Sequence, residues 1–147
     1  MRTLKTGNLI YFINGVYKIK EKKLIFVYNA DSGVINLVKD FWKKILRPSA
    51  YECNLCMQTF GAFSMRKDWK SFINNLDIDT EFLHRDEFEK KFNVNEAKYP
   101  SAYILESEKL KLIISDDEMN SVKSLDEMEV LVLSKINKLP YITQPIL

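Results

Sequence analysis

Cys53 and Cys56 are the residues whose type and spacing most directly indicate chemistry in this sequence. They are the only two cysteines among 147 residues, and they enclose Asn54 and Leu55 in a Cys-x-x-Cys pattern. Two thiols at this spacing can close a small disulfide or offer two sulfurs to one metal ion. They can also serve only as small buried apolar side chains. Which of these applies depends on the elements that position the pair.

Redox chemistry by the pair requires one thiol that ionises readily. If a turn of helix begins near Cys53, the backbone amides at its start favour the Cys53 thiolate. This thiolate would attack a disulfide, and Cys56 would then resolve the mixed species. Glu52 directly precedes the pair, and its negative charge opposes this ionisation. On this interpretation Cys53 and Cys56 are catalytic, and the partner is a protein or small-molecule disulfide.

A metal site is the alternative chemistry for the same two cysteines. Structural zinc takes four ligands, and Cys53, Cys56 and the single histidine, His84, supply three. A carboxylate, a water or a second subunit would have to complete the site. We expect His84 to form hydrogen bonds or to cap a helix rather than to bind a metal ion. Apart from zinc in this alternative, the sequence indicates no cofactor.

Length and composition indicate one soluble globular domain over residues 1–147. Apolar residues make up 46% and charged residues 29%, as in an average globular domain. The net charge of +2 gives no basis for nucleic-acid binding. No apolar run approaches the roughly 20 residues of a membrane-spanning helix, and no signal-peptide pattern is visible. We therefore expect a cytoplasmic protein with neither a nucleic acid nor a membrane as partner.

The first half of the chain shows two strand signals and two helix signals. Asn14-Gly15, between two apolar runs, predicts a β-hairpin that is either an edge hairpin or an N-terminal extension over residues 1–22. The continuous apolar run from Leu24 to Tyr28 predicts a strand covered on both faces. Helices are expected from Val34 to before Pro48 and over 66–76. Residues 48–65, which contain both cysteines, are expected to be the least regular part.

The second half repeats the alternation in a more compact form. Ser124 and Glu127 form a capping-box pattern, which predicts a helix to about Lys138. The acidic run 116–118 is interpreted as a solvated turn, and Pro140 and Pro145 predict an irregular tail over 140–147. Strands are predicted over 81–83, 102–105 and 110–114, with a helix over 86–92 and a polar turn over 106–109.

The order of these elements resembles the thioredoxin-like fold superfamily, best over residues 81–138. Residues Phe88 to Val94, and then Tyr99-Pro100-Ser101-Ala102-Tyr103-Ile104-Leu105, look like the short helix, the cis-proline and the next strand of that family. The resemblance implies an α/β fold with a central mixed sheet of about four strands flanked by helices, here with an N-terminal β-hairpin. It also implies that Pro100 lies beside the redox pair and that Tyr99 offers its backbone to an extended substrate.

The cysteines do not stand where that family places them along the chain. In the family the pair directly follows the first core strand, a position that here reads Asp31-Ser32-Gly33-Val34, about 20 residues earlier. Tyr-Asn-Ala-Asp-Ser-Gly with the later Cys-Asn-Leu-Cys also resembles small uncharacterised bacterial proteins. Some of those are labelled GTPases, but this chain has no Gly-x-x-x-x-Gly-Lys-Ser/Thr loop.

Three functions therefore stay open from the sequence. The first is a thiol–disulfide oxidoreductase that uses Cys53 and Cys56. The second is a metal-binding protein that adds His84 to the pair. The third is a redox-inactive binding module that keeps the fold and uses the surface around Pro100. The deciding question is whether residues 48–65 bring the cysteines beside Pro100 or His84.

Overall fold

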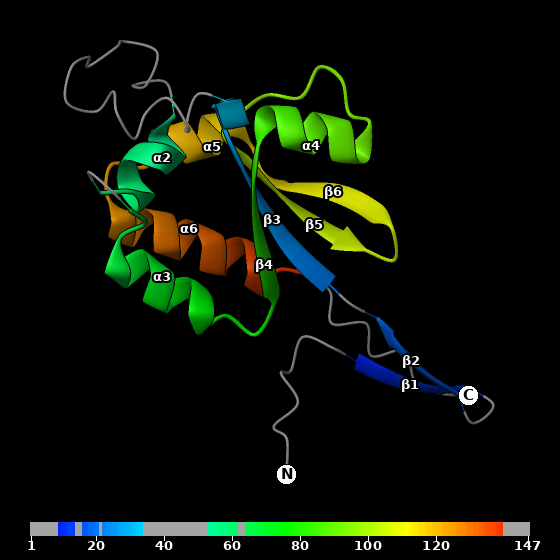
Figure 1. Ribbon diagram of the computed structural model, residues 1–147. Helices are drawn as coiled ribbons and strands as arrows, with labels where there is room; N and C mark the ends of the chain where they lie inside the picture. Colours follow the sequence, from blue (N-terminus) through cyan, green and yellow to red (C-terminus); the bar gives the residue numbers. More distant parts are fainter. Residues whose placement is uncertain (1–8, 14–15, 21, 34–52, 62–63, 140–147) are drawn as a thin grey trace.

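A four-stranded mixed sheet forms the centre of the protein (Figure 1). The computed structural model describes residues 9–13, 16–20, 22–33, 53–61 and 64–139. The sheet has the order β4-β3-β5-β6, in which β4 runs parallel to β3, and β5 and β6 each run antiparallel to the preceding strand in that order. The predicted mixed sheet is thus confirmed. Its strands are β3 (Lys22–Tyr28), β4 (Asp79–His84), β5 (Ser101–Glu106) and β6 (Lys109–Ile114).

The predicted N-terminal hairpin is also present. It consists of β1 (Leu9–Ile13) and β2 (Val16–Lys20), paired antiparallel with Leu9 opposite Lys20. The Asn14-Gly15 pair that predicted it lies outside the described residues. Figure 1 shows the hairpin apart from the four-stranded sheet.

β3 is buried on both faces, which is why its sequence is apolar throughout. Leu24, Phe26 and Tyr28 contribute to one core cluster, and Ile25 and Val27 contribute to another. Side chains alternate between the two faces of a strand, so a central strand covered on both sides needs apolar residues at successive positions.

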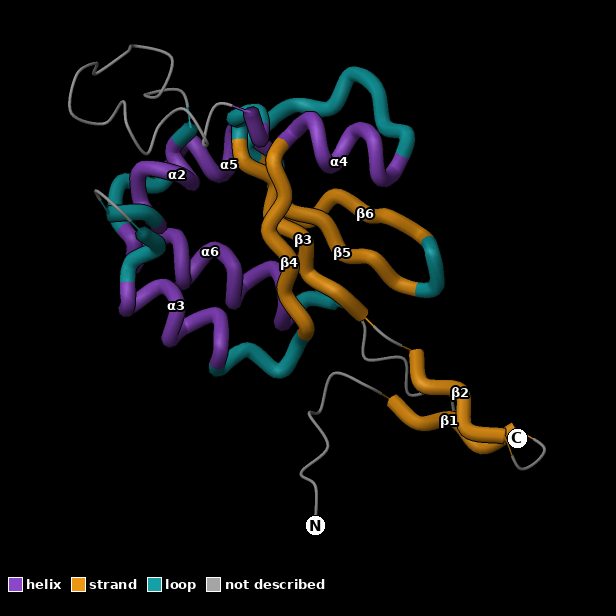
Figure 2. Tube along the Cα trace, viewed as in Figure 1, coloured by secondary structure: helices purple, strands orange, loops and turns teal. Residues whose placement is uncertain are grey.

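Helices cover the two faces unequally (Figure 2). One face carries α2 (Asn54–Thr59), α3 (Lys67–Asn74), α5 (Asp116–Ser121) and α6 (Leu125–Asn137), and the other carries α4 (Arg85–Phe92). Among the described residues, no helix has the length and apolar character needed to cross a membrane. The fold is therefore α/β, with helices on both sides of the sheet. The larger core cluster includes the fully buried side chains of Leu55, Trp69, Met119, Met128 and Val132.

Two segments differ from the local structure expected of them. Residues 48–65 were expected to be the least regular part of the chain, and within them Asn54–Thr59 form the short helix α2. Only Leu55 and Thr59 are buried in this helix, one turn apart, so six residues give too short a pattern to recognise. The acidic run 116–118 is the first turn of α5, capped by Ser115, whose side chain accepts from the Glu118 amide.

Other predictions were met only in part. Ser124 caps α6 by accepting from the Glu127 amide, but the Glu127 carboxylate accepts from the Lys123 amide instead of completing the capping box. The turn predicted over 106–109 is present, with positive φ at Ser107 and Glu108, residue types that rarely adopt this conformation.

The helix predicted from Val34 and the tail 140–147 lie outside the described residues.

Two valines of α6 test whether burial against the sheet stabilises the fold. Val132 is fully buried, whereas Val130 on the same helix is 67% exposed. Val132→Ala removes two buried methyl groups and leaves a cavity, so we expect it to lower the free energy of unfolding by about 2 kcal/mol. Val130→Ala is the matched control, and its effect should stay within about 0.5 kcal/mol. Urea denaturation measures both, and equal losses would contradict the assigned packing.

Candidate functional site

Three strands bring Tyr28, His84 and Pro100 to one end of the sheet. Tyr28 is the last residue of β3 and pairs with His84, the last residue of the parallel strand β4. On the other side of β3, Val27 pairs with Ser101, so Pro100 comes one residue before that pair. The Tyr99–Pro100 peptide bond is cis. The carboxyl ends of parallel strands commonly carry functional groups in α/β proteins.

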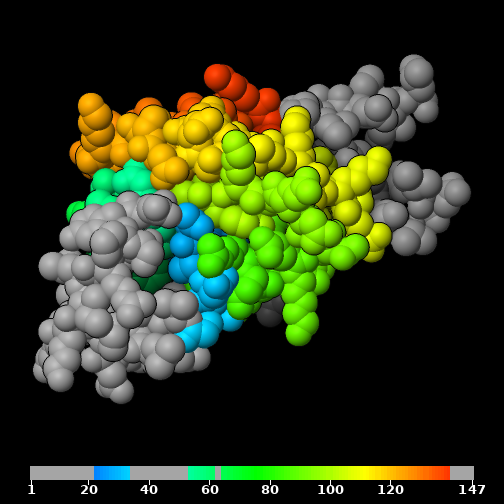
Figure 3. All heavy atoms as spheres, turned by 90° about the horizontal axis from the view of Figure 1, so that it is seen from above, coloured from blue at the N-terminus to red at the C-terminus, as the bar shows by residue number. Residues whose placement is uncertain are grey.

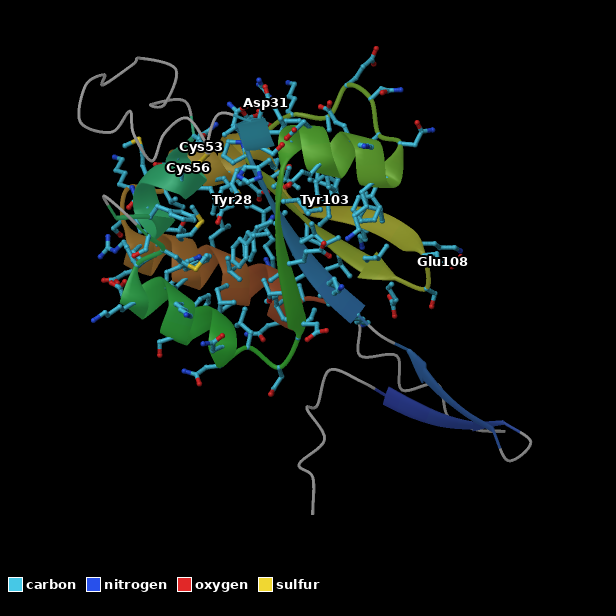
Figure 4. The ribbon with its side chains drawn as sticks, in the orientation of Figure 1. Tyr28, Asp31, Cys53, Cys56, Tyr103 and Glu108 are labelled. Carbon is cyan, nitrogen blue, oxygen red and sulfur yellow. A yellow bond between two sulfur atoms is a disulfide. The ribbon has the colours of Figure 1, made fainter. Side chains whose placement is uncertain are left out.

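Helix α2 packs over this end of the sheet and carries the two cysteines. The Tyr28 ring meets the ring of Phe60, the residue that ends α2, edge-on at a centroid distance of 5.6 Å. Cys53 and Leu55 belong to the same core cluster as Tyr28. Figure 4 shows Cys53 and Cys56 on the Tyr28 side of β3, and Tyr103 on the other side. Helix α2 and Phe60 therefore lie against the end of β3.

Cys53 and Cys56 are joined by a disulfide, with a distance of 2.16 Å between their Sγ atoms. Cys53 is the N-cap of α2, and its Sγ accepts a hydrogen bond from the Cys56 amide at 3.3 Å. A helix does begin beside Cys53, which is the condition under which backbone amides would favour its thiolate. Cys53 is only 2% exposed, whereas Cys56 is partly exposed. The two cysteine residues therefore differ in exposure, although their sulfurs are bonded to each other.

Asn54, inside the cysteine motif, fastens α2 to α5. Its side-chain amide donates to the carbonyl oxygens of Met119 and Val122, each at 2.7 Å. These carbonyls lie in the last turn of α5 and at its C-cap, where helix carbonyls lack partners within the helix. One side chain thus satisfies two backbone acceptors and fixes the start of α2. Sequence reasoning assigned Asn54 no role, because the signal is a contact between distant segments.

Tyr28 lies beneath α2 and joins it to β4. Its ring stacks on Phe82 and lies 5.9 Å from the His84 ring, measured between centroids. Burial raises the pKa of the Tyr28 hydroxyl far above its ordinary value, and the neighbouring Thr59 hydroxyl opposes this only weakly. Among the described residues, no group forms a hydrogen bond of acceptable geometry with the Tyr28 hydroxyl. Tyr28 is therefore neutral, and its ring packs beneath α2 mainly through apolar contacts.

His84 caps α4, one of the two roles expected for it. Its backbone amide donates to Glu87 Oε2 at 2.9 Å, and its Nδ1 lies 2.8 Å from the same oxygen. These interactions, led by the backbone hydrogen bond, lower the pKa of Glu87. No cluster of three or more His, Cys, Asp or Glu side chains suited to an ion occurs in the described parts of the chain. The zinc site of Cys53, Cys56 and His84 stays a prediction.

The side chain of Tyr99 packs against helix α4 and is not available to contact a substrate. Its hydroxyl donates to the Glu89 carboxylate at 3.1 Å, and its ring contacts Phe88 of α4 edge-on at 6.1 Å. Burial, followed by the Glu89 interaction, raises the pKa of Tyr99 well above its ordinary value. Since its side chain is engaged with α4, only its backbone is left for the substrate contact predicted for Tyr99 and Pro100. That contact stays a prediction.

A polar clamp formed by Asp31, Ser32, Arg85 and Asp86 joins the segment after β3 to the start of α4. Arg85 donates to both carboxylate oxygens of Asp31, at 2.6 and 2.7 Å. Ser32 donates to Asp86 through its amide at 2.8 Å and its hydroxyl at 2.5 Å. Arg85 lowers the pKa of Asp31, and Ser32 lowers the pKa of Asp86. The clamp fixes Asp31 and Ser32 of the segment that follows β3 to the start of α4.

Sequence reasoning missed the clamp, although two signals pointed to it. Asp31 and Ser32 come a few residues after β3, and Arg85 and Asp86 directly follow the neighbouring parallel strand β4. Charged residues after two neighbouring parallel strands meet at the same edge of a sheet. Figure 3 shows blue residues of the segment 22–33 at the molecular surface, beside green residues from later in the chain.

The chain matches no protein-family model, no curated protein and no solved structure. Thiol–disulfide exchange requires access to a sulfur and a thiolate that can leave, and Cys56 is the more exposed residue of this disulfide.

The Asn54 contact can be tested through stability. Asn54→Ala leaves two helix-end carbonyls without their donor, so we expect the free energy of unfolding to fall by about 2 kcal/mol. Asn74→Ala is the control, since Asn74 is exposed at the end of α3 and its replacement should cost less than about 0.5 kcal/mol. Both variants are compared in the oxidised form by chemical denaturation. Equal stabilities would refute the anchoring role of Asn54.

Because the clamp contains two carboxylates with lowered pKa values, we expect the protein to lose stability in acid. The pKa of Asp86 is lowered in the folded state, so its stabilisation is present above the unfolded pKa and is lost as the pH falls through the folded pKa. We expect the urea midpoint to fall between about pH 5 and about pH 3, and to fall less in Asp86→Asn. Ser32→Ala should also flatten the curve, because the Ser32 hydroxyl is the main cause of the low pKa. A curve unchanged in both variants would contradict this assignment.

Proposed function

We propose that this protein is a thiol–disulfide oxidoreductase of the thioredoxin-like superfamily, with Cys53 and Cys56 as its reacting pair and no cofactor. One observation carries the proposal. The two cysteines form a disulfide at the start of a helix that packs over the end of the central strand.

The arrangement of the sheet supports the family assignment. The order β4-β3-β5-β6, with one parallel and two antiparallel pairs, follows the connections that the resemblance implies. Pro100 precedes β5 and has a cis peptide bond, as the family's proline does. The late position of the cysteines is compatible with this assignment, since α2 lies at the strand ends despite residues 34–52 between it and β3.

The proposed chemistry is thiol–disulfide exchange at the carboxyl end of β3. A thiolate attacks a disulfide sulfur, forms a mixed disulfide and is released when the second thiol attacks. Pro100 and the backbone of Tyr99 would hold an extended polypeptide next to the pair, as the family resemblance implies. The substrate would be a protein or small-molecule disulfide or dithiol. A cytoplasmic location is compatible with a pair that cycles between its two states.

The proposal predicts a reversible and catalytically competent pair. A mild oxidant should close the reduced pair to the Cys53–Cys56 disulfide, and dithiothreitol should reopen it, as shown by peptide mass mapping. The wild-type protein should accelerate reduction of a model protein disulfide by dithiothreitol. Cys53→Ser and Cys56→Ser should each reduce this rate to the uncatalysed background, because one thiol cannot complete the cycle.

Two controls make the outcome decisive. Circular dichroism and thermal unfolding must show that each serine variant is folded. Met57→Ala changes an exposed neighbour of the pair and leaves both thiols in place, so it should retain exchange activity. Thiols that never pair, or a folded serine variant with wild-type activity, would overturn the proposal.

A further inference from the structure

We infer that Cys56, and not Cys53, is the sulfur through which the substrate enters the reaction. This inference rests on the proposed function and specifies its chemistry. It reverses the roles expected from the sequence, where Cys53 was the attacking thiol and Cys56 the resolving one. The mixed disulfide with the substrate would form at Cys56, and Cys53 would be the leaving and resolving thiol.

The different exposure of the two cysteine residues carries the inference. Cys53 is 2% exposed and lies within the core cluster that includes Leu55 and Met119. Cys56 is partly exposed and packs only against the margin of that cluster. Its neighbour Met57 is 50% exposed, and Phe60, one turn further on, is 37% exposed. An external thiolate must reach the sulfur that it attacks, and the folded protein offers Cys56 for this contact.

The hydrogen bonding of Cys53 suits a leaving thiolate. The Cys56 amide already points at Cys53 Sγ, at 3.3 Å, in the oxidised protein. When the disulfide breaks, the same amide can stabilise negative charge on this sulfur, because a hydrogen bond to the charged form favours that form. A thiol with a lower pKa leaves faster in exchange. Asn54 holds the start of α2 to α5, so the amide does not have to move for this step.

The exchange balances with a dithiol substrate as the reductant. A substrate thiolate attacks Cys56 Sγ, a bond forms between these two sulfurs, and the electron pair of the Cys53–Cys56 bond leaves on Cys53 Sγ. The second substrate thiolate then attacks the substrate sulfur of the mixed disulfide and expels Cys56 as a thiolate. The substrate is oxidised to a disulfide, and the cysteine pair is reduced. The protons lost by the substrate thiols neutralise the two protein thiolates, directly or through water.

Competition labelling of the reduced wild-type protein tests the order of access. A limiting amount of iodoacetamide is added to the folded protein, and peptide mapping gives the label at each cysteine. We expect about tenfold more label at Cys56 than at Cys53, because thiol reactivity follows access as well as ionisation. In guanidinium at a denaturing concentration, the preference should disappear. Equal labelling in the folded protein, or faster labelling of Cys53, would overturn the inference.

Single-cysteine variants test which thiol holds a partner. Cys53→Ser, which leaves Cys56, should form a stable mixed disulfide with a chromogenic aryl disulfide about tenfold faster than Cys56→Ser does. The denatured variants should react at similar rates, which controls for the reagent. A faster reaction of folded Cys56→Ser would contradict the inference. The wild-type labelling does not depend on the folding of either variant.

The outcomes separate this inference from the proposed function. If the reduced pair never closes to a disulfide under oxidant, the proposed function fails, and this inference fails with it. If the pair closes and reopens but Cys53 is the first thiol to be labelled, the function stands and the assignment of Cys56 is wrong.

Discussion

The burial of β3 on both faces is the constraint on which the rest of the structure depends. A strand with apolar side chains on both sides requires a layer of helices on each face, and α4 on one side and the α2–α3–α5–α6 layer on the other supply them. The strand also needs a partner along each edge, and β4 and β5 fill these places. Its last residue, Tyr28, therefore lies where two strands and a covering helix meet. The candidate site is a consequence of this packing.

Two sets of polar contacts fix the elements that meet there. Asn54 holds the cysteine-bearing helix to α5, and the clamp of Asp31, Ser32, Arg85 and Asp86 holds the segment after β3 to α4. The clamp is partly exposed, so its ion pair is screened and contributes less than a buried pair would. The contact of Asn54 satisfies carbonyls at the end of a helix, where an unpaired acceptor is costly. The position of the disulfide thus depends on a side chain inside the cysteine motif itself.

Much of the fold was predictable because it follows from local patterns. The continuous apolar run of β3, the Asn14-Gly15 hairpin and the alternation of strands and helices after residue 66 each have a short-range physical cause. Helix α2 was not predictable in this way, since its six residues bury only two side chains and its stability comes from contacts with α5 and β3. The acidic turn of α5 was misjudged because charge at a helix start and charge in a solvated loop look alike in sequence.

The sequence predicted individual residues of the candidate site but not their arrangement in space. The sequence identified Cys53, Cys56, His84 and Pro100, but their common position at the strand ends depends on the register of three strands. Tyr28 was expected only as a core residue, and Asn54 and the clamp were missed, because each acts through contacts between distant segments. The unequal exposure of the two cysteines likewise depends on tertiary packing.

A redox titration of the Cys53–Cys56 pair tests whether it cycles between dithiol and disulfide in the folded protein. The folded protein is equilibrated with dithiol and disulfide buffers over a range of ratios, and the fraction of disulfide is measured by mass mapping after acid quenching. The account predicts one reversible two-electron transition, with the same midpoint approached from the oxidised and the reduced side, and with the fold kept in both states. A pair that stays reduced or stays oxidised at every ratio, or that changes state only when the protein unfolds, would contradict it.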